Sequence, residues 1–456
     1  MVLKLYAAIG SPAVRGTLLT IEALGLKNVE IVPVDLFAGE HLKPEFVAKN
    51  PLHTVPTLED GNFILWDSHA INAYLVNQYG KNDALYPKDG QKRAKVDSLN
   101  HFDNGYLFAR VAKIIGSLFN PDQKTIIKEQ ADALVEAYGF LEAILANKPF
   151  VAGDQLTIAD LSLLATATTA DALIPIDAQK YPKITAWIKK LKALPYYKKA
   201  NEEGLQGIAG FIKSKLGWSR KKYARYLSSR LACCKVSLKM VLKLYSAAAS
   251  PAVRGTLLTI EALGLTNVEI VPINLMTGDH LKPEFLEKNP VHSIPTLEDD
   301  GFIVWDSHAI NAYLASKYGK DDSLYPKDLQ IRASVDALNQ FDNGYLFARF
   351  AKIIRALFAG ASGIAKEDAD SLVEAYGFLE AILNKREYVA GKQLTIADLS
   401  ILATTTTAVA AVPLDENKFP KVSAWLNRLK QLPYYKKANE EGLQQIAGFL
   451  KSKLSS

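Results

Sequence analysis

The chain contains one long sequence twice. The stretch SPAVRGTLLTIEALGL occupies residues 11–26 and returns letter for letter at 250–265. The hexapeptide MVLKLY opens each copy, so the copies cover 1–218 and 240–456. This period is far longer than the 20–50 residues of a solenoid repeat. Each copy is long enough to bury the cores of two small domains.

One residue is missing from the second copy. The opening hexapeptide recurs with an offset of 239 residues, whereas PYYKKANEEGLQ, at 195–206 and 433–444, recurs with an offset of 238. The change falls in a patch that differs between the copies, NPDQKTIIKEQ at 120–130 and AGASGIAKED at 359–368. Loops tolerate deletions better than helices or strands, so we expect a loop there.

The join between the copies, residues 219–239, resembles neither of them. It reads SRKKYARYLSSRLACCKVSLK and carries seven Lys or Arg residues and no acid. We interpret it as a solvated linker, with a tether or a basic binding patch as the functional alternative. The second copy begins with its own Met240. A further interpretation is therefore that two neighbouring genes have been read as one chain.

The net charge of +6 is concentrated in this join. Residues 1–218 have a net charge of +1, the join contributes +7, and residues 240–456 have −2. The two large copies are therefore almost neutral. This distribution argues against a broad electrostatic surface for nucleic acid.

The composition indicates a soluble globular protein. Hydrophobic residues make up 49% of the chain and charged residues 22%, which is ordinary for globular domains, and no run of about 18 apolar residues predicts a membrane span. Lys4 and Arg15 interrupt the apolar N-terminus, which does not resemble a secretory signal. The only cysteines, Cys233 and Cys234, are adjacent and too few for a disulfide framework. We therefore expect a cytoplasmic protein.

The first 80 residues or so of each copy predict mixed strands and helices. In the first copy, LKLYA at 3–7 and VEIVPV at 29–34 are short, apolar and partly β-branched, as strands are. Between them, residues 12–24 have helical apolar spacing, with Pro12 at the first helical position and Gly25 as the stop. A strand, a helix and a second strand in this order favour parallel pairing.

The remaining pattern completes an α/β domain and then becomes helical. TVPTLED and NFILWD predict two strands joined by a turn at the DG pair, and SHAINAYLVNQYG predicts a helix with Ser68 as N-cap and Gly80 as the stop. After LYPKD only helices are predicted. Thr157 and Asp160 stand in capping-box spacing at the head of one of them. Each copy is therefore predicted to be an α/β domain followed by an all-α domain.

These motifs, in this order and present twice, resemble those of glutathione S-transferases. The shared features are Ser-Pro between a strand and a helix, HTVPTLED, DSHAI, and a helical half with LTIAD; LFAGEHLKPEF and LMTGDHLKPEF favour the insect epsilon class within the delta/epsilon group. The resemblance covers both copies and leaves only the join outside. It implies a thioredoxin-like glutathione-binding domain and an all-α domain in each copy, at 1–82 and 88–218, then at 240–321 and 327–456, with 219–239 as a linker.

Ser11 and Ser250 are the catalytic residues that the resemblance implies. A hydroxyl at this position can donate a hydrogen bond to sulfur, and the helix N-terminus favours negative charge. The thiolate is the reactive form of a thiol, whose pKa is about 8.5, and lowering that pKa by about two units requires about 2.7 kcal/mol. A plain helix N-cap is the alternative. No G-x-S-x-G elbow surrounds either serine, which argues against an acylated serine.

Tyr6 and Tyr245, in the first strand of each copy, are alternative hydroxyl donors. Some transferase classes use a tyrosine in this region, but we expect these two to pack. Classes with a reactive cysteine are disfavoured, because SPAVR contains none.

The HTVP motif is implied to bind the middle and the glycyl end of glutathione. The family has a cis proline at the position of Pro56, and the backbone of Val55 would pair with the cysteinyl part like a sheet edge. His53 would meet the glycyl carboxylate with His41 nearby, while a surface-loop position is the alternative for both. No metal is expected, since no short histidine pattern or nearby cysteine is present. The equivalents in the second copy are His280, His292, Ile294 and Pro295.

The DSHA motif is implied to bind the γ-glutamyl end. Ser68 at a helix N-terminus would hold the carboxylate, Asp67 would take the α-ammonium group, and His69 of the same motif is also a glutathione-binding residue by resemblance. The family more often has Glu in place of Asp67, and an ordinary N-cap pair is the alternative. The equivalents are Asp306, Ser307 and His308.

The segment FDNGYLFARVAKIIGSLF, 102–119, is predicted to be a helix that faces the α/β domain. The resemblance implies that it binds the electrophile, although aromatic stripes at helical spacing are more often core. Val111 of the first copy corresponds to Phe350 of the second, and this difference indicates that the copies differ in substrate preference. Asp160 and Asp398 are expected to be structural. The implied electrophile-binding residues are Tyr106, Phe108, Arg110, Val111 and Phe119, with Tyr345, Phe347, Arg349, Phe350 and Phe358 in the second copy.

The sequence therefore predicts a glutathione transferase with two active centres, which uses glutathione as co-substrate and conjugates it to apolar electrophiles in detoxification. The epsilon-like pattern adds dehydrochlorination and peroxide reduction as accessory activities. A non-catalytic carrier of apolar ligands is the alternative, and an interaction module of a translation complex would carry an extra domain. Transferases of this family are usually dimers. A 21-residue join spans at most about 70 Å, enough for an intramolecular pseudo-dimer, with a homodimer as the alternative.

Overall fold

The computed structural model describes residues 2–216, 242–384 and 386–454. The chain divides into two compact units, 1–232 and 233–456, and each unit repeats the same order of elements. The predicted linker at 219–239 lies outside the described residues. In the parts of the chain that the structure describes, no helix combines the length and the apolar character that a membrane crossing requires.

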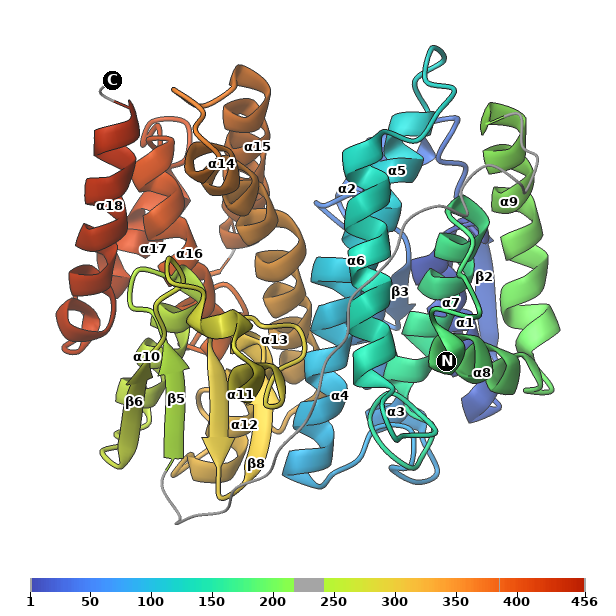
Figure 1. Cartoon of the computed structure of the whole chain (residues 1–456), viewed down its shortest axis with the longest axis horizontal. Coiled ribbons are helices and arrows are strands. Elements are labelled where there is room, and N and C mark those ends of the chain that lie inside the picture. The colour runs from blue at the N-terminus through green and yellow to red at the C-terminus, as the bar shows by residue number, and fades with distance from the viewer. Residues whose placement is uncertain (1, 217–241, 385, 455–456) are drawn as a thin grey trace. The chain divides into compact units, whose positions relative to one another are not determined.

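Each unit begins with a four-stranded mixed sheet (Figure 1). The strand orders are β2-β1-β3-β4 and β6-β5-β7-β8, and the first two strands of each unit pair in parallel as predicted, whereas the others are antiparallel. The strands are β1 (Leu3–Ala7), β2 (Val29–Pro33), β3 (Thr57–Asp60) and β4 (Phe63–Trp66), followed in the second unit by β5 (Leu242–Ser246), β6 (Val268–Pro272), β7 (Thr296–Asp299) and β8 (Phe302–Trp305).

Two helices of the α/β domain pack on each other, and short helical turns connect the second strand to the third. The helix α1 starts at Pro12 and ends at Gly25, whose φ of 68° is the left-handed conformation that glycine adopts readily. These elements are α1 (Pro12–Leu24), η1 (Glu40–Leu42), α2 (Pro44–Val47) and α3 (Ser68–Tyr79), then α10 (Pro251–Ala262), η4 (Asp279–Leu281), α11 (Pro283–Leu286) and α12 (Ser307–Tyr318).

The prediction of Ser68 as N-cap of α3 is wrong. Asp67 is the N-cap, because its carboxylate accepts hydrogen bonds from the amides of His69 and Ala70, at 2.9 and 3.2 Å. Ser68 is instead the first helical residue. Gly80 ends the helix as predicted.

The rest of each unit is helical. The first unit continues with α4 (Gly90–Phe102), η2 (Asp103–Phe108), α5 (Ala109–Leu118), α6 (Lys128–Ile144), α7 (Ile158–Leu173), α8 (Pro182–Lys192), η3 (Lys198–Glu202) and α9 (Glu203–Leu216). The second continues with α13 (Leu329–Phe341), η5 (Asp342–Phe347), α14 (Ala348–Phe358), α15 (Lys366–Leu383), α16 (Ile396–Ala411), α17 (Pro420–Leu429), η6 (Lys436–Glu440) and α18 (Glu441–Leu454).

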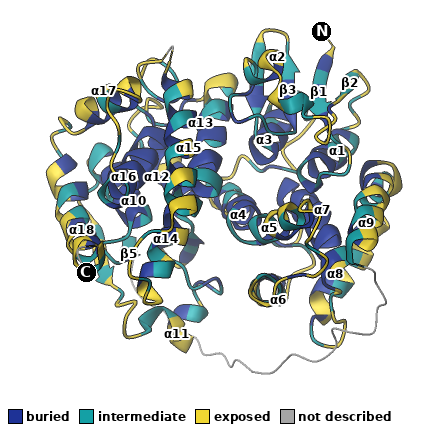
Figure 2. Ribbon diagram, turned by 90° about the horizontal axis from the view of Figure 1, so that it is seen from above, coloured by how far each residue is buried: buried dark blue, intermediate teal, exposed yellow. Residues whose placement is uncertain are grey.

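The helix α7 forms the centre of the helical domain and is buried along most of its length (Figure 2). The predicted capping box of Thr157 and Asp160 is present at its head, and Thr395 and Asp398 form the same box in α16. α1 packs directly on α7. A Cβ atom added at Gly16 would lie 3.1 Å from the Cα of Ser162, which shows how closely the two domains approach.

The predicted helix at 102–119 is present, because the backbone stays helical from the end of α4 through η2 into α5. Its first residues, Asp103–Phe108, form the π-helical turn η2, and α5 begins only at Ala109. The variable patch covers most of the connection between α5 and α6, and its equivalent most of that between α14 and α15, so the predicted loop is present. The last three residues of each patch belong to the following helix. The proposed domain boundaries remain predictions.

Candidate functional site

Ser11 is the N-cap residue of α1, but its side chain does not cap the helix. The residue has an extended conformation (φ −68°, ψ 129°), and its hydroxyl makes no hydrogen bond to the first turn. Its amide donates to the carbonyl of Ala8 at 2.9 Å, which closes a tight turn before the helix. Ser250 repeats this geometry. The hydroxyl therefore lies at the positive end of a helix and is available to an external group.

Tyr6 is occupied by contacts within its own domain. Its hydroxyl donates to Glu59 at 2.9 Å, and its ring meets the edge of Phe46 with centroids 6.0 Å apart. Tyr245 donates to Glu298 at 2.8 Å; burial and this hydrogen bond raise the pKa of its phenol. These contacts favour the predicted packing role.

The HTVP segment begins at a strained backbone position, His53. Its cis peptide bonds precede Pro56 and Pro295, as the resemblance implies, and His53 has a φ of 47°. The side-chain amide of Asn50 donates to the Thr54 carbonyl at 2.9 Å and so fixes the turn from within. The backbone groups of Val55 make no hydrogen bond with the described residues. They are therefore available to an extended ligand.

The histidines His41 and His53 lie together, with ring centroids 6.0 Å apart. Burial and the charge of His53 lower the pKa of His41. The Nδ1 atom of His41 is buried and has no hydrogen-bond partner among the described residues. His280 and His292 form the same pair at 5.8 Å. A ligand carboxylate placed beside His41 could hydrogen-bond to this nitrogen, whose burial without a partner costs free energy.

Asp67 lies at the turn into α3 with a φ of 70°, and its side chain is 17% exposed. Its carboxylate satisfies two amides of the first helical turn. Ser68, directly after it, is buried at the same helix end. The pair thus places one carboxylate and one hydroxyl at a helix N-terminus, where a ligand with both a carboxylate and an ammonium group can be held.

His69 is buried between this helix end and the helical domain. Its Nε2 atom lies 3.0 Å from Asp103, and its Nδ1 atom lies 3.4 Å from Asp67. Thr166 of α7 donates to the same Asp103 carboxylate at 3.2 Å. The ring is therefore engaged by two carboxylates, and the contact with glutathione that the resemblance implies for His69 stays a prediction.

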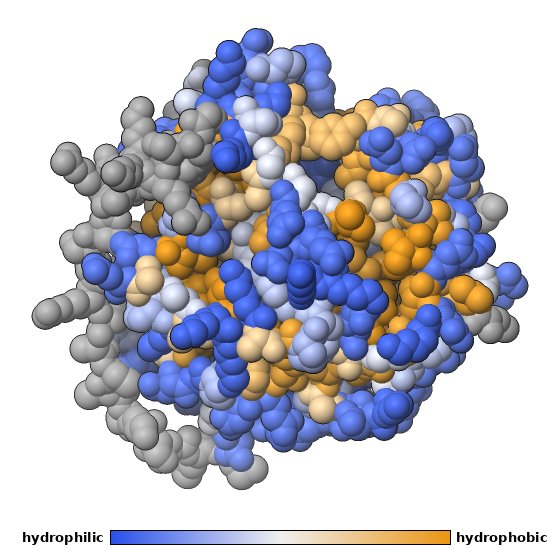
Figure 3. Space-filling model, turned by 90° about the vertical axis from the view of Figure 1, so that its right-hand side faces the viewer, coloured by the Kyte–Doolittle hydropathy of each residue, from blue (hydrophilic) through white to orange (hydrophobic). Residues whose placement is uncertain are grey.

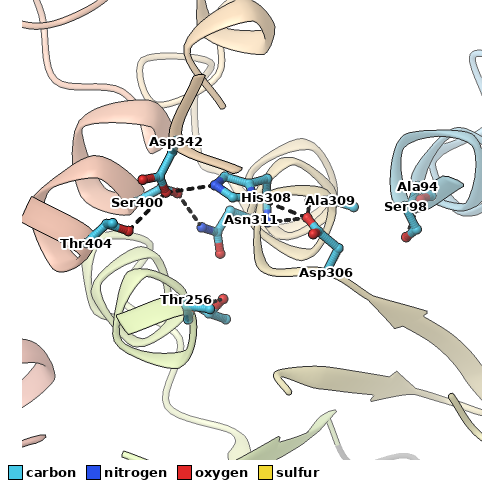
Figure 4. A network of polar contacts seen from close by, with 11 residues as sticks. Ala94, Ser98, Thr256, Asp306, His308, Ala309, Asn311, Asp342, Ser400 and Thr404 are labelled. Atoms are coloured by element: carbon cyan, nitrogen blue, oxygen red, sulfur yellow. Dashed lines mark hydrogen bonds and ion pairs between the residues drawn. The ribbon is translucent and has the colours of Figure 1, made fainter. Parts of the chain in front are cut away.

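The second unit contains the same network (Figure 4). His308 lies between Asp306 at 3.2 Å and Asp342 at 2.9 Å, and Thr404 donates to Asp342. Burial alone would lower the pKa of this imidazole, but the hydrogen bonds and charges of both carboxylates outweigh burial and raise the pKa to about 10, as they do for His69. Asp103 and Thr166, with their equivalents, were not predicted.

The residues predicted to bind the electrophile differ in how far they are exposed. Val111 and Phe350 are 0% and 2% exposed, so in this structure they are core residues. Arg110 donates to the Tyr106 carbonyl at 2.9 Å and to Glu136 at 2.8 Å, and its guanidinium lies over the Tyr106 ring. Phe119, in contrast, is 48% exposed.

Phe119 belongs to an aromatic cluster that the sequence did not reveal. Its ring centroid lies 5.3 Å from that of Phe37 and 5.2 Å from that of Phe211 on α9, and Phe37 is 73% exposed. Ile208, on the same face of α9 as Phe211, lies beside Gly10 of the loop at residues 8–11, which we call the serine loop. Figure 3 shows apolar side chains gathered on the face of the first unit that carries α9. The cluster thus extends the serine loop with an apolar surface.

The second unit has a different cluster. Phe358 and Phe449 stack with centroids 4.5 Å apart. Met276 stands at the position of Phe37 and is 81% exposed. An aromatic ring in one unit is therefore replaced by a flexible thioether in the other.

Comparisons with known proteins agree with this architecture. The family "Glutathione S-transferase, N-terminal domain" matches residues 1–77 and 240–316, and "Glutathione S-transferase, C-terminal domain" matches 108–195 and 360–433. Glutathione S-transferase 1 of Manduca sexta is 44% identical over 218 residues, which are 47% of this chain and 100% of the relative.

Two solved structures are also similar. An epsilon-class glutathione S-transferase from the housefly, Musca domestica, is 50% identical and aligns with 46% of this chain and 98% of its own, with a TM-score of 0.46. A glutathione transferase homologue from Drosophila mojavensis, with bound glutathione, is 47% identical and aligns with 47% of this chain and 99% of its own, with a TM-score of 0.46.

The chain belongs to the glutathione S-transferase family, and both family domains occur twice in it. Each unit therefore joins a thioredoxin-like domain to the helical domain of the family. The similar proteins are insect transferases of the delta and epsilon classes, and each aligns with about half of the chain. The chain is accordingly a glutathione transferase enzyme.

Proposed function

We propose that each unit is a separate active centre in which Ser11 or Ser250 stabilises the thiolate of glutathione. The observation that carries this proposal is the serine hydroxyl, which lies at the N-terminus of α1 or α10 without capping it. A hydrogen bond to an anion is stronger than one to a neutral acceptor, and the helix end adds favourable charge. Both effects lower the pKa of the bound thiol.

The tripeptide is held by three neighbouring segments. The α-ammonium and α-carboxylate groups of its γ-glutamyl end bind Asp67 and Ser68 at the start of α3. The backbone of Val55 pairs with the cysteinyl residue, and the glycyl carboxylate accepts from His53 and His41. The buried, unpaired Nδ1 atom of His41 supports this last contact. The second unit uses Asp306, Ser307, Ile294, His292 and His280.

The reaction joins the glutathione sulfur to an apolar electrophile. The thiolate attacks an electron-poor carbon, the C–S bond forms, and the leaving group, such as chloride, departs with the bonding electron pair. The serine keeps its proton and donates its hydrogen bond to sulfur throughout. Holding both reactants together supplies much of the rate.

The aromatic cluster of Phe37, Phe119 and Phe211 supports an apolar electrophile in the first unit. Met276 at the position of Phe37 supports a different preference in the second. We assign the enzyme to cytoplasmic detoxification, with dehydrochlorination and peroxide reduction as accessory activities. We further propose that the two units of a chain pair as the subunits of other transferases do, which predicts a particle of one chain's mass that resists dilution; a homodimer would have twice that mass.

Calorimetry combined with turnover tests this function. We expect one glutathione to bind in each unit, and the whole chain to conjugate glutathione to an activated aryl chloride. Binding without turnover over a panel of aryl chlorides, epoxides and hydroperoxides would identify a non-catalytic carrier instead.

A further inference from the structure

The two longest recurring segments contact each other within each unit. The guanidinium of Arg15, from SPAVRGTLLTIEALGL, is fully buried and donates to the side-chain oxygens of Asn201, in PYYKKANEEGLQ, and of Thr169 on α7. At the far end of α1, Glu22 pairs with Lys199 at 2.6 Å. Segments that are remote in sequence are thus fastened side by side. The second unit repeats this with Arg254, Asn439 and Thr407, and with Glu261 and Lys437.

Gly204, at the start of α9, is the point of closest approach to the serine loop. A Cβ atom added there would lie 2.2 Å from the carbonyl oxygen of Ile9 and 2.9 Å from Cδ of Arg15. The equivalent distances at Gly442 are 2.2 Å to the carbonyl oxygen of Ala248 and 2.8 Å to Cδ of Arg254. Ile9 lies two residues before Ser11, inside the turn that the Ser11 amide closes.

The other glycines of α9 show that this contact is specific. Nothing lies within 4 Å of a Cβ atom added at Gly207 or Gly210. The second unit even has Gln445 at the position of Gly207. One turn after Gly204, Ile208 lies on the same helix face, and a Cβ atom added at Gly10 would be 3.8 Å from its Cβ.

We propose that Gly204 and Gly442 are positioning residues for the catalytic serine, an inference that rests on the proposed function. The start of α9 packs against the loop at 8–11, and the hydrogen bond between Arg15 and Asn201 holds this part of the chain against α1. Because Gly204 lacks a side chain, the Ile9 carbonyl can contact the backbone of α9. This contact fixes the position of the loop and therefore of the Ser11 hydroxyl at the N-terminus of α1. A side chain at 204 would push the loop or the helix outward.

The test isolates the first centre in full-length protein that carries Ser250→Ala. In this background, Gly204→Ala is compared with Gly207→Ala, the matched control on the same helix. The ultraviolet absorbance of the bound thiolate is followed against pH without electrophile, and kcat and the KM for glutathione are measured separately. A displacement of about 1 Å can reduce a rate about 100-fold.

We expect Gly204→Ala to raise the pKa of the bound thiol by about one unit and to lower kcat at least about tenfold. The KM for glutathione should change less than about twofold, because His53, Asp67 and Ser68 lie on other elements. Gly207→Ala should leave all three values unchanged. An unaltered thiol pKa and kcat in folded Gly204→Ala would overturn the proposal.

A milder variant covers the case in which Gly204→Ala does not fold. Ile208→Ala removes side-chain atoms beside the loop without adding any, and we expect it also to raise the thiol pKa; no change there would overturn the proposal equally. Ser11→Ala in the same background separates the two ideas. If Ser11→Ala fails to raise the thiol pKa, the proposed function is wrong. If it does and the α9 variants do not, only the positioning role is wrong.

Discussion

The Nε2 atom of His69 lies 3.0 Å from Oδ2 of Asp103, although the two residues belong to different domains of the first unit. The imidazole also neighbours Asp67, the residue proposed to bind the ammonium group of glutathione. A buried imidazole therefore links the start of α3 to η2 in the helical domain. The equivalent in the second unit joins His308 and Asp342 at 2.9 Å.

This link predicts a pH-dependent stability. The pKa of both imidazoles is raised to about 10, compared with about 6.5 in an unfolded chain. The folded protein thus binds a proton at each imidazole more tightly than the unfolded chain does. The stabilisation from this protonation is therefore complete below about pH 6.5 and declines as the pH rises towards about 10.

We expect the double variant His69→Gln and His308→Gln to lose about 3–5 kcal/mol of unfolding free energy in each unit near neutral or lower pH. Urea unfolding of both proteins across this range checks the prediction. The difference between them should shrink with rising pH. A constant difference would mean that the imidazoles are neutral in the folded protein.

The capping box predicts a stability effect without a catalytic one. Thr157→Ala should cost about 1 kcal/mol. Asp160→Ala should cost more, because the carboxylate also accepts from the Val151 amide at 2.9 Å and from Trp187 at 3.0 Å, and each buried donor left unpaired costs about 1–3 kcal/mol. Thermal unfolding and kcat at low temperature measure the two effects. A fall in kcat at unchanged stability would place Asp160 in the active site.

The histidine pair predicts recognition of the glycyl carboxylate. Changing His53 and His292 to alanine should raise the KM for glutathione about tenfold with little change in kcat. γ-Glutamylcysteine lacks the glycyl residue, so its KM should be the same in the variant and the wild-type protein. Equal effects on both thiols would show that the histidines act elsewhere.

The differing clusters predict different electrophile preferences. With only the first centre active, Phe37→Met should lower kcat/KM for flat aromatic electrophiles about two- to tenfold, as expected for the loss of aromatic stacking. With only the second active, Met276→Phe should raise it. Ile127→Met, at an exposed position outside the cluster, serves as a control. Identical selectivity in all variants would remove the cluster from the electrophile site.

Local signals explain what the sequence could predict. Strands, the ends of α1 and the capping boxes follow from apolar spacing and from Pro, Gly, Thr and Asp at fixed offsets. The sequence predicted Ser68 as the N-cap in place of Asp67 because both are good capping residues and are adjacent in the chain. Only the backbone conformation decides between them, since Asp67 adopts a φ of 70°.

Contacts between remote segments explain what was missed. His69 finds Asp103 in another domain, and Phe37 meets Phe211 only after α9 has packed back on the α/β domain. Neither pair has a signal in local periodicity. The recurrence of PYYKKANEEGLQ was visible, but its role required the structure, where Asn201 holds Arg15 and Gly204 meets the Ile9 carbonyl.

The most direct test of the account is turnover of glutathione with an activated aryl chloride in four proteins: the wild type, Ser11→Ala, Ser250→Ala and the double variant. We predict that each single change removes part of kcat and that the double change removes nearly all of it, while glutathione still binds in both units. A double variant that retains the full kcat would contradict the central claim that the two serines hold the thiolate.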